Sequence, residues 1–218
     1  MKKLFTLLAL TISFSMNAQV STNSTSPTGT YASAMGYSTT ASGDSSTAMG
    51  SNTTASGDYS TAMGDATTAS GDLSTAMGYL TTASGDYSVA MGIATTASGG
   101  SSTAMGYSTT ASGYYSTTMG YLTTASDYAS LVIGQYNSSG SSVTNNATSF
   151  NTANTAFVIG NGTASNAKSD AFKVMFNGDT TVSNDLTVSG DVNISSDARL
   201  KSNIVSLGST LSKLLQID

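Results

Sequence analysis

Few side chains in this 218-residue sequence could carry out chemistry. The sequence contains no His, no Cys, no Trp and no Glu. Without His or Cys, a Ser-His-Asp triad, a Cys-His pair and a zinc site are excluded. Four carboxylates recur every fourteen residues, at Asp44, Asp58, Asp72 and Asp86. The nonapeptide pattern of calcium-binding β-helices is absent, so we interpret this column as a solvated acidic edge and expect no metal site and no cofactor.

Charge and hydropathy narrow the range of partners. The net charge is −5, and no Lys or Arg occurs between Lys3 and Lys168. Nucleic acid is therefore not expected as a partner, because neutralising phosphates requires clustered basic side chains. Residues 1–18 have a basic start, a short apolar run and a small residue at Ala18, which predicts a cleaved signal peptide. The run is too short to span a bilayer, so we expect an exported protein at the cell surface or outside the cell, with no transmembrane segment.

A fourteen-residue repeat runs through residues 31–134, after a linker expected at 19–30. Its marker is a Met-Gly pair, replaced by Ile-Gly in the eighth copy, and the marker residues are Met35, Met49, Met63, Met77, Met91, Met105, Met119 and Ile133. A second Gly column lies seven residues along, so each repeat has two half-units. This short, fixed period predicts an all-β solenoid, in which each coil has two strands of about five residues joined by tight turns.

Alternation along each strand assigns the side chains to two faces. Two facing strands with tight turns leave little interior, so only small side chains fit inside. The residues expected inside one coil are Ser46, Ala48, Gly50, Thr53, Ala55 and Gly57. The Met column then points outward, where an exposed apolar ladder on a monomer would aggregate. We therefore expect the eight marker residues to form the core of a homotrimer.

Two segments carry a resemblance to a known family: "YSTAMGDATTASGD" at 59–72 and "GDYSVAMGIATTASG" at 85–99. They resemble the head repeats of trimeric autotransporter adhesins, the YadA-like heads, and the resemblance covers about residues 31–134. It implies a left-handed parallel β-roll that packs as a homotrimer through its aliphatic column. Met replaces the family's usual Ile or Val, which keeps the trimer axis apolar but makes it less stiff. The implied function is attachment to a host or environmental surface, and no enzymatic activity is expected.

The columns on the outside of the coils provide candidate binding residues. Tyrosines recur at the turns, at Tyr37, Tyr59, Tyr79, Tyr87, Tyr107 and Tyr121. Each offers a flat apolar face and a hydroxyl, so these residues either bind a host protein or glycan or simply pack between turns. An ice-binding β-solenoid is an alternative function, because an outward hydroxyl array recurs at Thr54, Ser56, Thr68, Ser70, Thr82, Ser84, Thr96 and Ser98.

The repeat stops after residue 134. The polar stretch 135–152 has no period and predicts a long loop. Residues 153–195 alternate apolar and polar side chains around Asn177-Gly178, which predicts a β-rich neck or stalk with hairpins.

The C-terminal segment 196–218 contains "SDARLKSNI", which resembles the opening of the endosialidase-type intramolecular chaperone domain. That resemblance implies a self-cleavage dyad of Ser196 and Lys201. Apolar spacing after the motif predicts one short amphipathic helix. The family's domain is much longer, so we expect a truncated start without self-cleavage. A tail-fibre-like receptor-binding protein would share this design and is a further alternative.

Overall fold

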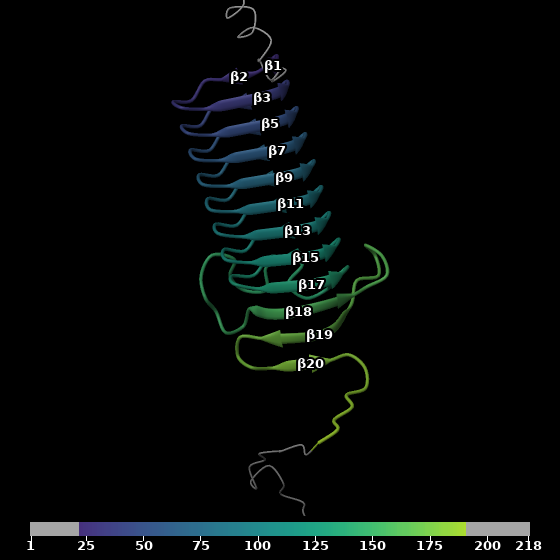
Figure 1. Cartoon of the computed structure of the whole chain (residues 1–218). Helices are drawn as coiled ribbons and strands as arrows, with labels where there is room; N and C mark the ends of the chain where they lie inside the picture. The colour runs from purple at the N-terminus through teal and green to yellow at the C-terminus, as the bar shows by residue number, and fades with distance from the viewer. Residues whose placement is uncertain (1–21, 191–218) are drawn as a thin grey trace, which may run out of the picture. The chain divides into compact units, whose positions relative to one another are not determined.

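The computed structural model describes residues 22–190, and its strands stack as successive coils (Figure 1). Within this range the chain forms twenty β-strands and no helix. The predicted signal peptide at 1–18 lies outside the described residues. So do Ser196, Lys201 and the short helix expected within 196–218.

Two sheets form the walls of the solenoid. The longer sheet has twelve strands: β1 (Thr22–Asn23), β3 (Ser33–Tyr37), β5 (Thr47–Ser51), β7 (Thr61–Asp65), β9 (Thr75–Tyr79), β11 (Val89–Ile93), β13 (Thr103–Tyr107), β15 (Thr117–Tyr121), β17 (Leu131–Gln135), β18 (Thr155–Asn161), β19 (Asp170–Met175) and β20 (Thr180–Val182). The shorter sheet has eight: β2 (Ser26–Pro27), β4 (Thr40–Ala41), β6 (Thr54–Ala55), β8 (Thr68–Ala69), β10 (Thr82–Ala83), β12 (Thr96–Ala97), β14 (Thr110–Ala111) and β16 (Thr124–Ala125).

Neighbouring coils pair in parallel with a register of fourteen residues. In the longer sheet Met49 lies opposite both Met35 and Met63, and in the shorter sheet Thr54 lies opposite Thr68. The prediction of an all-β parallel solenoid with this period is confirmed.

The second strand of each coil is shorter than predicted, with two residues in place of about five. Two successive amides, those of Ser56 and Gly57, donate to the same carbonyl of Ala69, at 2.8 and 3.3 Å. This shared acceptor ends the regular ladder, because consecutive amides of an extended strand point in opposite directions and cannot share one carbonyl. Tyr59 then turns the chain in a left-handed backbone conformation, with φ of 58°.

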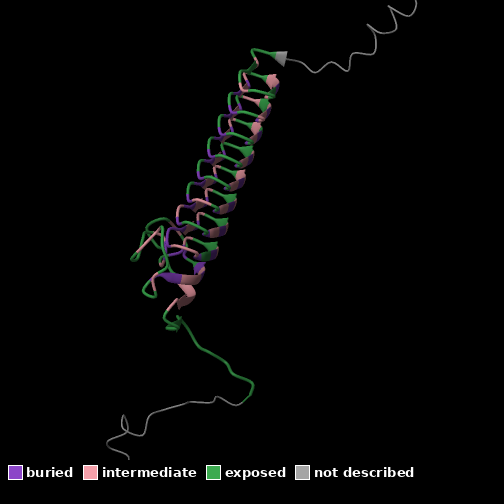
Figure 2. Cartoon of the chain, turned by 90° about the vertical axis from the view of Figure 1, so that its left-hand side faces the viewer, coloured by how far each residue is buried: buried purple, intermediate pink, exposed green. Residues whose placement is uncertain are grey.

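The interior is lined by small side chains, and the same burial class recurs at the same place in successive coils (Figure 2). Ala48 and Ala55 are completely buried, as are Ser46 and Thr53. Gly57 is also buried, so five of the six residues expected inside this coil are confirmed.

Gly50 is the exception, since it is exposed at the surface of the solenoid. Its φ is 120°, and a Cβ atom built there would lie 2.0 Å from the carbonyl oxygen of Gly64. The prediction that it lines the interior was wrong. This glycine column instead lets the backbones of stacked coils approach closely in a conformation that L side chains avoid.

Buried hydroxyls without hydrogen-bond partners recur along the interior of the described coils. Twelve have no hydrogen-bond partner among the described residues: those of Thr39, Ser46, Thr53, Ser60, Thr67, Ser74, Thr81, Ser88, Thr95, Ser102, Thr109 and Ser116. One coil differs, because Thr118 replaces the interior alanine and its hydroxyl donates to Thr123 at 2.7 Å. The interior is thus polar at regular intervals as well as narrow.

The sheets extend beyond both ends of the repeat. Strands β1 and β2 lie within the predicted linker 19–30 and pair with β3 and β4, so the solenoid begins before residue 31. At the other end β18 pairs in parallel with β17, which places Ile159 opposite Ile133. Strands β19 and β20 follow as an antiparallel hairpin around Asn177-Gly178, as predicted.

The polar loop after β17 contains no strand up to Thr155 and is fixed by a buried carboxylate. Asp127 is completely buried and accepts the amide N–H groups of Thr144 and Thr155, at 2.6 and 2.8 Å. Asn137 forms a similar bridge to both backbone groups of Thr124, at 2.8 Å each. Residues 185–190 belong to a second unit and form no strand.

Candidate binding surfaces of the solenoid

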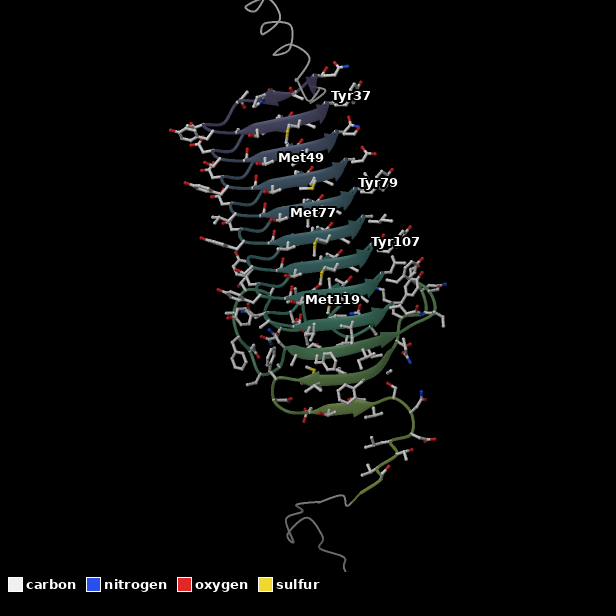
Figure 3. All side chains as sticks on the ribbon, in the orientation of Figure 1. Tyr37, Met49, Met77, Tyr79, Tyr107 and Met119 are labelled. Carbon is white, nitrogen blue, oxygen red and sulfur yellow. The ribbon has the colours of Figure 1, made fainter. Side chains whose placement is uncertain are left out.

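The Met column lies on the outer face of the longer sheet. In Figure 3 the labelled Met49, Met77 and Met119 lie one above another on β5, β9 and β15. Met63 is 38 % exposed, and the other six methionines of the column and Ile133 are half-buried. The outward orientation predicted for this column is confirmed.

The apolar column is longer than the repeat predicted. Ile159 continues it beyond Ile133, in register on β18. The sequence carried a signal for this extension, since Val158-Ile159-Gly160 repeats Val132-Ile133-Gly134. A column of half-buried Thr or Val side chains runs alongside it, at Thr47, Thr61, Thr75, Val89, Thr103 and Thr117. The outer face of the longer sheet is therefore flat, regular and largely without charge.

The six candidate tyrosines fall into two columns rather than one site. Tyr37, Tyr79, Tyr107 and Tyr121 end the long strands, whereas Tyr59 and Tyr87 lie in the turns before β7 and β11. All six are exposed, and Tyr59 is the most exposed at 64 %. The two columns lie at opposite ends of the five-residue strands, so the structure does not bring them together.

Packing between turns accounts for part of the first tyrosine column. Tyr107 and Tyr121 stack with ring centroids 5.0 Å apart, and Tyr136 meets Tyr121 edge-on at 5.4 Å. A side-chain hydrogen bond with Tyr121 raises the pKa of the Tyr136 phenol, with smaller contributions from desolvation and from nearby Tyr charge. Ser51 and Asp65 separate Tyr37 from Tyr79, so these two rings have no such neighbour in register.

The aspartate column forms a hydrogen-bond ladder along one turn. Each carboxylate accepts the backbone N–H of the equivalent residue one coil earlier: Thr30 donates to Asp44, Asp44 to Asp58, Asp58 to Asp72 and Asp72 to Asp86, at 2.8 to 3.0 Å. The acidic edge predicted from the sequence therefore also satisfies backbone donors in a turn that lacks strand pairing. Gly100 and Tyr114 occupy the next two places in the column and end the ladder.

The hydroxyl array of the ice-binding alternative lies on the outer face of the shorter sheet. Thr54, Thr68, Thr82 and Thr96 are half-buried, and Ser56, Ser70, Ser84 and Ser98 are exposed. The rows are in register through the pairing of β6 to β12. The array ends at Ser126, which is buried and accepts the hydroxyl hydrogen of Ser112 at 3.1 Å.

The part of the chain that the structure describes contains no group of three or more metal-ligating His, Cys, Asp or Glu side chains. Over the same residues no helix is long and apolar enough to cross a membrane.

Comparison with known families finds a match to the repeat. No curated protein matches the chain. The family model "YadA head domain repeat (2 copies)" matches residues 28–53, 41–67, 55–72, 69–93 and 97–123. Residues 28–93 and 97–123 thus match YadA head domain repeats, and they form part of the parallel β-solenoid.

Proposed function

We propose that this chain forms the head of a homotrimeric, surface-exposed adhesin that attaches to host or environmental surfaces. The observation that carries the proposal is the outward Met column on coils that match YadA head repeats. Burying one half-exposed Met contributes about 1 to 2 kcal/mol, and seven of them recur in a straight row. Three left-handed rolls packed through this column would remove the exposed ladder from water.

The trimer is tested by the mass of the full chain in solution. Light scattering should return three chain masses. Met77→Lys places a charge in the column and should release monomers, because three buried ammonium groups would meet at the axis. Thr82→Lys, on the outer face of the shorter sheet, is the matched control and should leave the trimer intact. A folded monomer of the unmodified chain would contradict the proposal.

Adhesion itself needs a separate measurement. Bacteria that display the chain should attach to immobilised host proteins or glycans more than bacteria without it. Alanine replacement of Tyr59 and Tyr87 should weaken attachment if the exposed turn column makes the contact. Export by residues 1–18 and a chaperone segment at 196–218, with Ser196 and Lys201, belong to this proposal as predictions of the sequence.

Ice binding is the second candidate, favoured by the in-register hydroxyl rows on the shorter sheet. An ice-recrystallisation assay tests it directly. Inhibition that is lost on Thr68→Lys but kept on Met77→Lys would favour this function over adhesion. A tail-fibre-like receptor-binding protein would have the same geometry. The location of the protein, on the bacterial surface or on a phage particle, distinguishes the two functions.

A further inference from the structure

The aspartate ladder ends at Asp86, whereas the coils continue to β17, so two backbone amides beyond the ladder lack an acceptor among the described residues. Asp72 donates its N–H to Asp86, but the next place in the column is Gly100, which has no side chain to accept the N–H of Asp86. Tyr114 follows, and its ring offers no carboxylate to the N–H of Gly100. Within residues 22–190 neither amide has an acceptor, whereas the carbonyls of both are paired, with Ser101 and Tyr115.

A pocket of about 400 Å³ lies at this interruption. Its walls include the hydroxyl-bearing residues Ser84, Ser98 and Ser101 beside Asp86 and Gly100. Tyr87, Tyr114 and Tyr115 also line it; Tyr87 and Tyr115 are 62 and 57 % exposed, and the Tyr114 ring lies beside Gly100. One site thus combines two amide donors without an acceptor, three serines and exposed tyrosines.

The surrounding charge decides which kind of acceptor fits the amides. The carboxylate of Asp86 lies at the site, and that of Asp72 lies one coil away. Lys168 is the first basic residue after Lys3, so no cation in the coils offsets these charges. An anionic ligand would meet like charge here, whereas a neutral carbonyl oxygen would accept the N–H bonds without that cost.

We propose that this gap, defined by Asp86, Gly100 and the pocket around them, binds an N-acetylated sugar. The acetamido carbonyl oxygen takes the place of the carboxylate missing at Gly100. The sugar ring stacks on Tyr87 or Tyr115, and its hydroxyls exchange hydrogen bonds with the serines. The inference deepens the adhesive function proposed above and rests on it for its biological role.

The test is a titration of the ¹⁵N-labelled full chain with a trimer of N-acetylglucosamine, followed by amide NMR. The amides of Asp86 and Gly100 should shift in a saturable way. A glucose trimer, which lacks the acetamido group, should not shift them. Equal shifts with the glucose trimer, or larger shifts with glucuronate, would overturn the neutral-carbonyl assignment. Equal shifts with an N-acetylated amino-acid amide would overturn the assignment to a sugar.

One substitution closes the gap with the column's own residue. Gly100→Asp should direct a carboxylate onto the N–H of Asp86 and weaken sugar binding at least tenfold. The side chain fits, because a Cβ at Gly100 would lie 3.4 Å from the Tyr114 ring. Ser51→Asp is the matched control: it adds the same charge where the next coil carries Asp65, and it should leave binding unchanged. Full sugar binding by Gly100→Asp, with folding verified by circular dichroism, would contradict the proposal.

Attachment by displaying bacteria is measured in parallel. Attachment without sugar binding would reject this inference alone. Sugar binding without attachment would reject the adhesive function and leave the site in place.

Discussion

The regular coils and the segment that closes them are held together in different ways. In the coils, most positions carry the same residue type every fourteen residues, and backbone hydrogen bonds and recurring small residues hold neighbouring coils together. From Asp127 onward each polar contact occurs once. Three side chains bond to backbone groups of residues distant in the sequence. The Asp127 carboxylate accepts the amides of Thr144 and Thr155, the Asn137 side chain donates to the Thr124 carbonyl, and that of Asn154 donates to the Asn146 carbonyl.

The difference shows what repetition can and cannot supply. A repeat unit stabilises its neighbours, so the coils keep their register even with twelve unpaired interior hydroxyls. The last coil has no following unit, and an open sheet end invites pairing with other chains. The chain ends the parallel stack with a buried carboxylate, a fixed loop and an antiparallel hairpin. Stability in the coils is therefore distributed, whereas at the closing segment it depends on single side chains.

The largest effect is expected where stacked backbones touch. In Gly78→Ala the new Cβ would lie 2.0 Å from the carbonyl oxygen of Gly92, at a φ of 126°. Both the clash and the backbone conformation oppose the side chain, so the free energy of unfolding should fall by about 4 kcal/mol. Urea unfolding followed by circular dichroism measures the loss.

The matched control for this substitution lies in the closing hairpin. Gly178 has a φ of 93° and nothing within 4 Å of its built Cβ. Gly178→Ala should therefore cost only about 1 kcal/mol, from the backbone conformation alone. Equal losses for the two variants would mean that the coils do not depend on close backbone contact.

The second prediction concerns the carboxylate that closes the solenoid. Asp127→Ala leaves two amides, those of Thr144 and Thr155, without their acceptor inside the protein. The expected cost is about 3 kcal/mol, together with faster hydrogen exchange in the polar loop. Asp72→Ala removes an exposed carboxylate with one amide partner, so it should cost about 1 kcal/mol or less. If Asp127→Ala and Asp72→Ala lowered the free energy of unfolding equally, the closing segment would not depend on single side chains more than the coils do.

The regular coils could be predicted from the sequence more fully than the closing segment. The period predicted the parallel solenoid, and alternation placed Ala48, Ala55 and Met49 on the correct faces. Both depend only on spacing, which is visible in one sequence. Gly50 was misplaced because alternation describes strand residues, whereas this residue lies at positive φ where a strand turns.

The contacts of the closing segment could not be predicted, because they have no period. Asp127 does carry a signal, since it interrupts a column otherwise filled by glycine. Nothing in the spacing shows that its two oxygens reach Thr144 and Thr155. The sequence shows that Gly100 interrupts the aspartate column. It does not show that each aspartate accepts an amide N–H from the coil before it, so the unpaired amide of Asp86 could not be predicted.

The smallest effect is expected from introducing the Thr118–Thr123 hydroxyl pair of the closing coils into a regular coil. Thr118 replaces an interior alanine and pairs with Thr123, five residues later. One coil earlier, Ala104 is equivalent to Thr118 and Thr109 is equivalent to Thr123. The Thr109 hydroxyl is buried and has no hydrogen-bond partner among the described residues. Ala104→Thr should supply the missing partner and raise the free energy of unfolding by about 1 kcal/mol, because a buried hydroxyl gains its bond. Denaturant midpoints at equal protein concentration measure the gain.

Ala104→Val is the matched control for the added volume. Val132 occupies the same column on β17, so a β-branched side chain fits inside the coil. Valine adds apolar contact but leaves the Thr109 hydroxyl unpaired, and it should stabilise the chain less than threonine does. If valine stabilised it as much or more, interior hydroxyls would impose no penalty in the coils. The polar partners of the closing segment would then serve to fix the loop rather than to satisfy the interior.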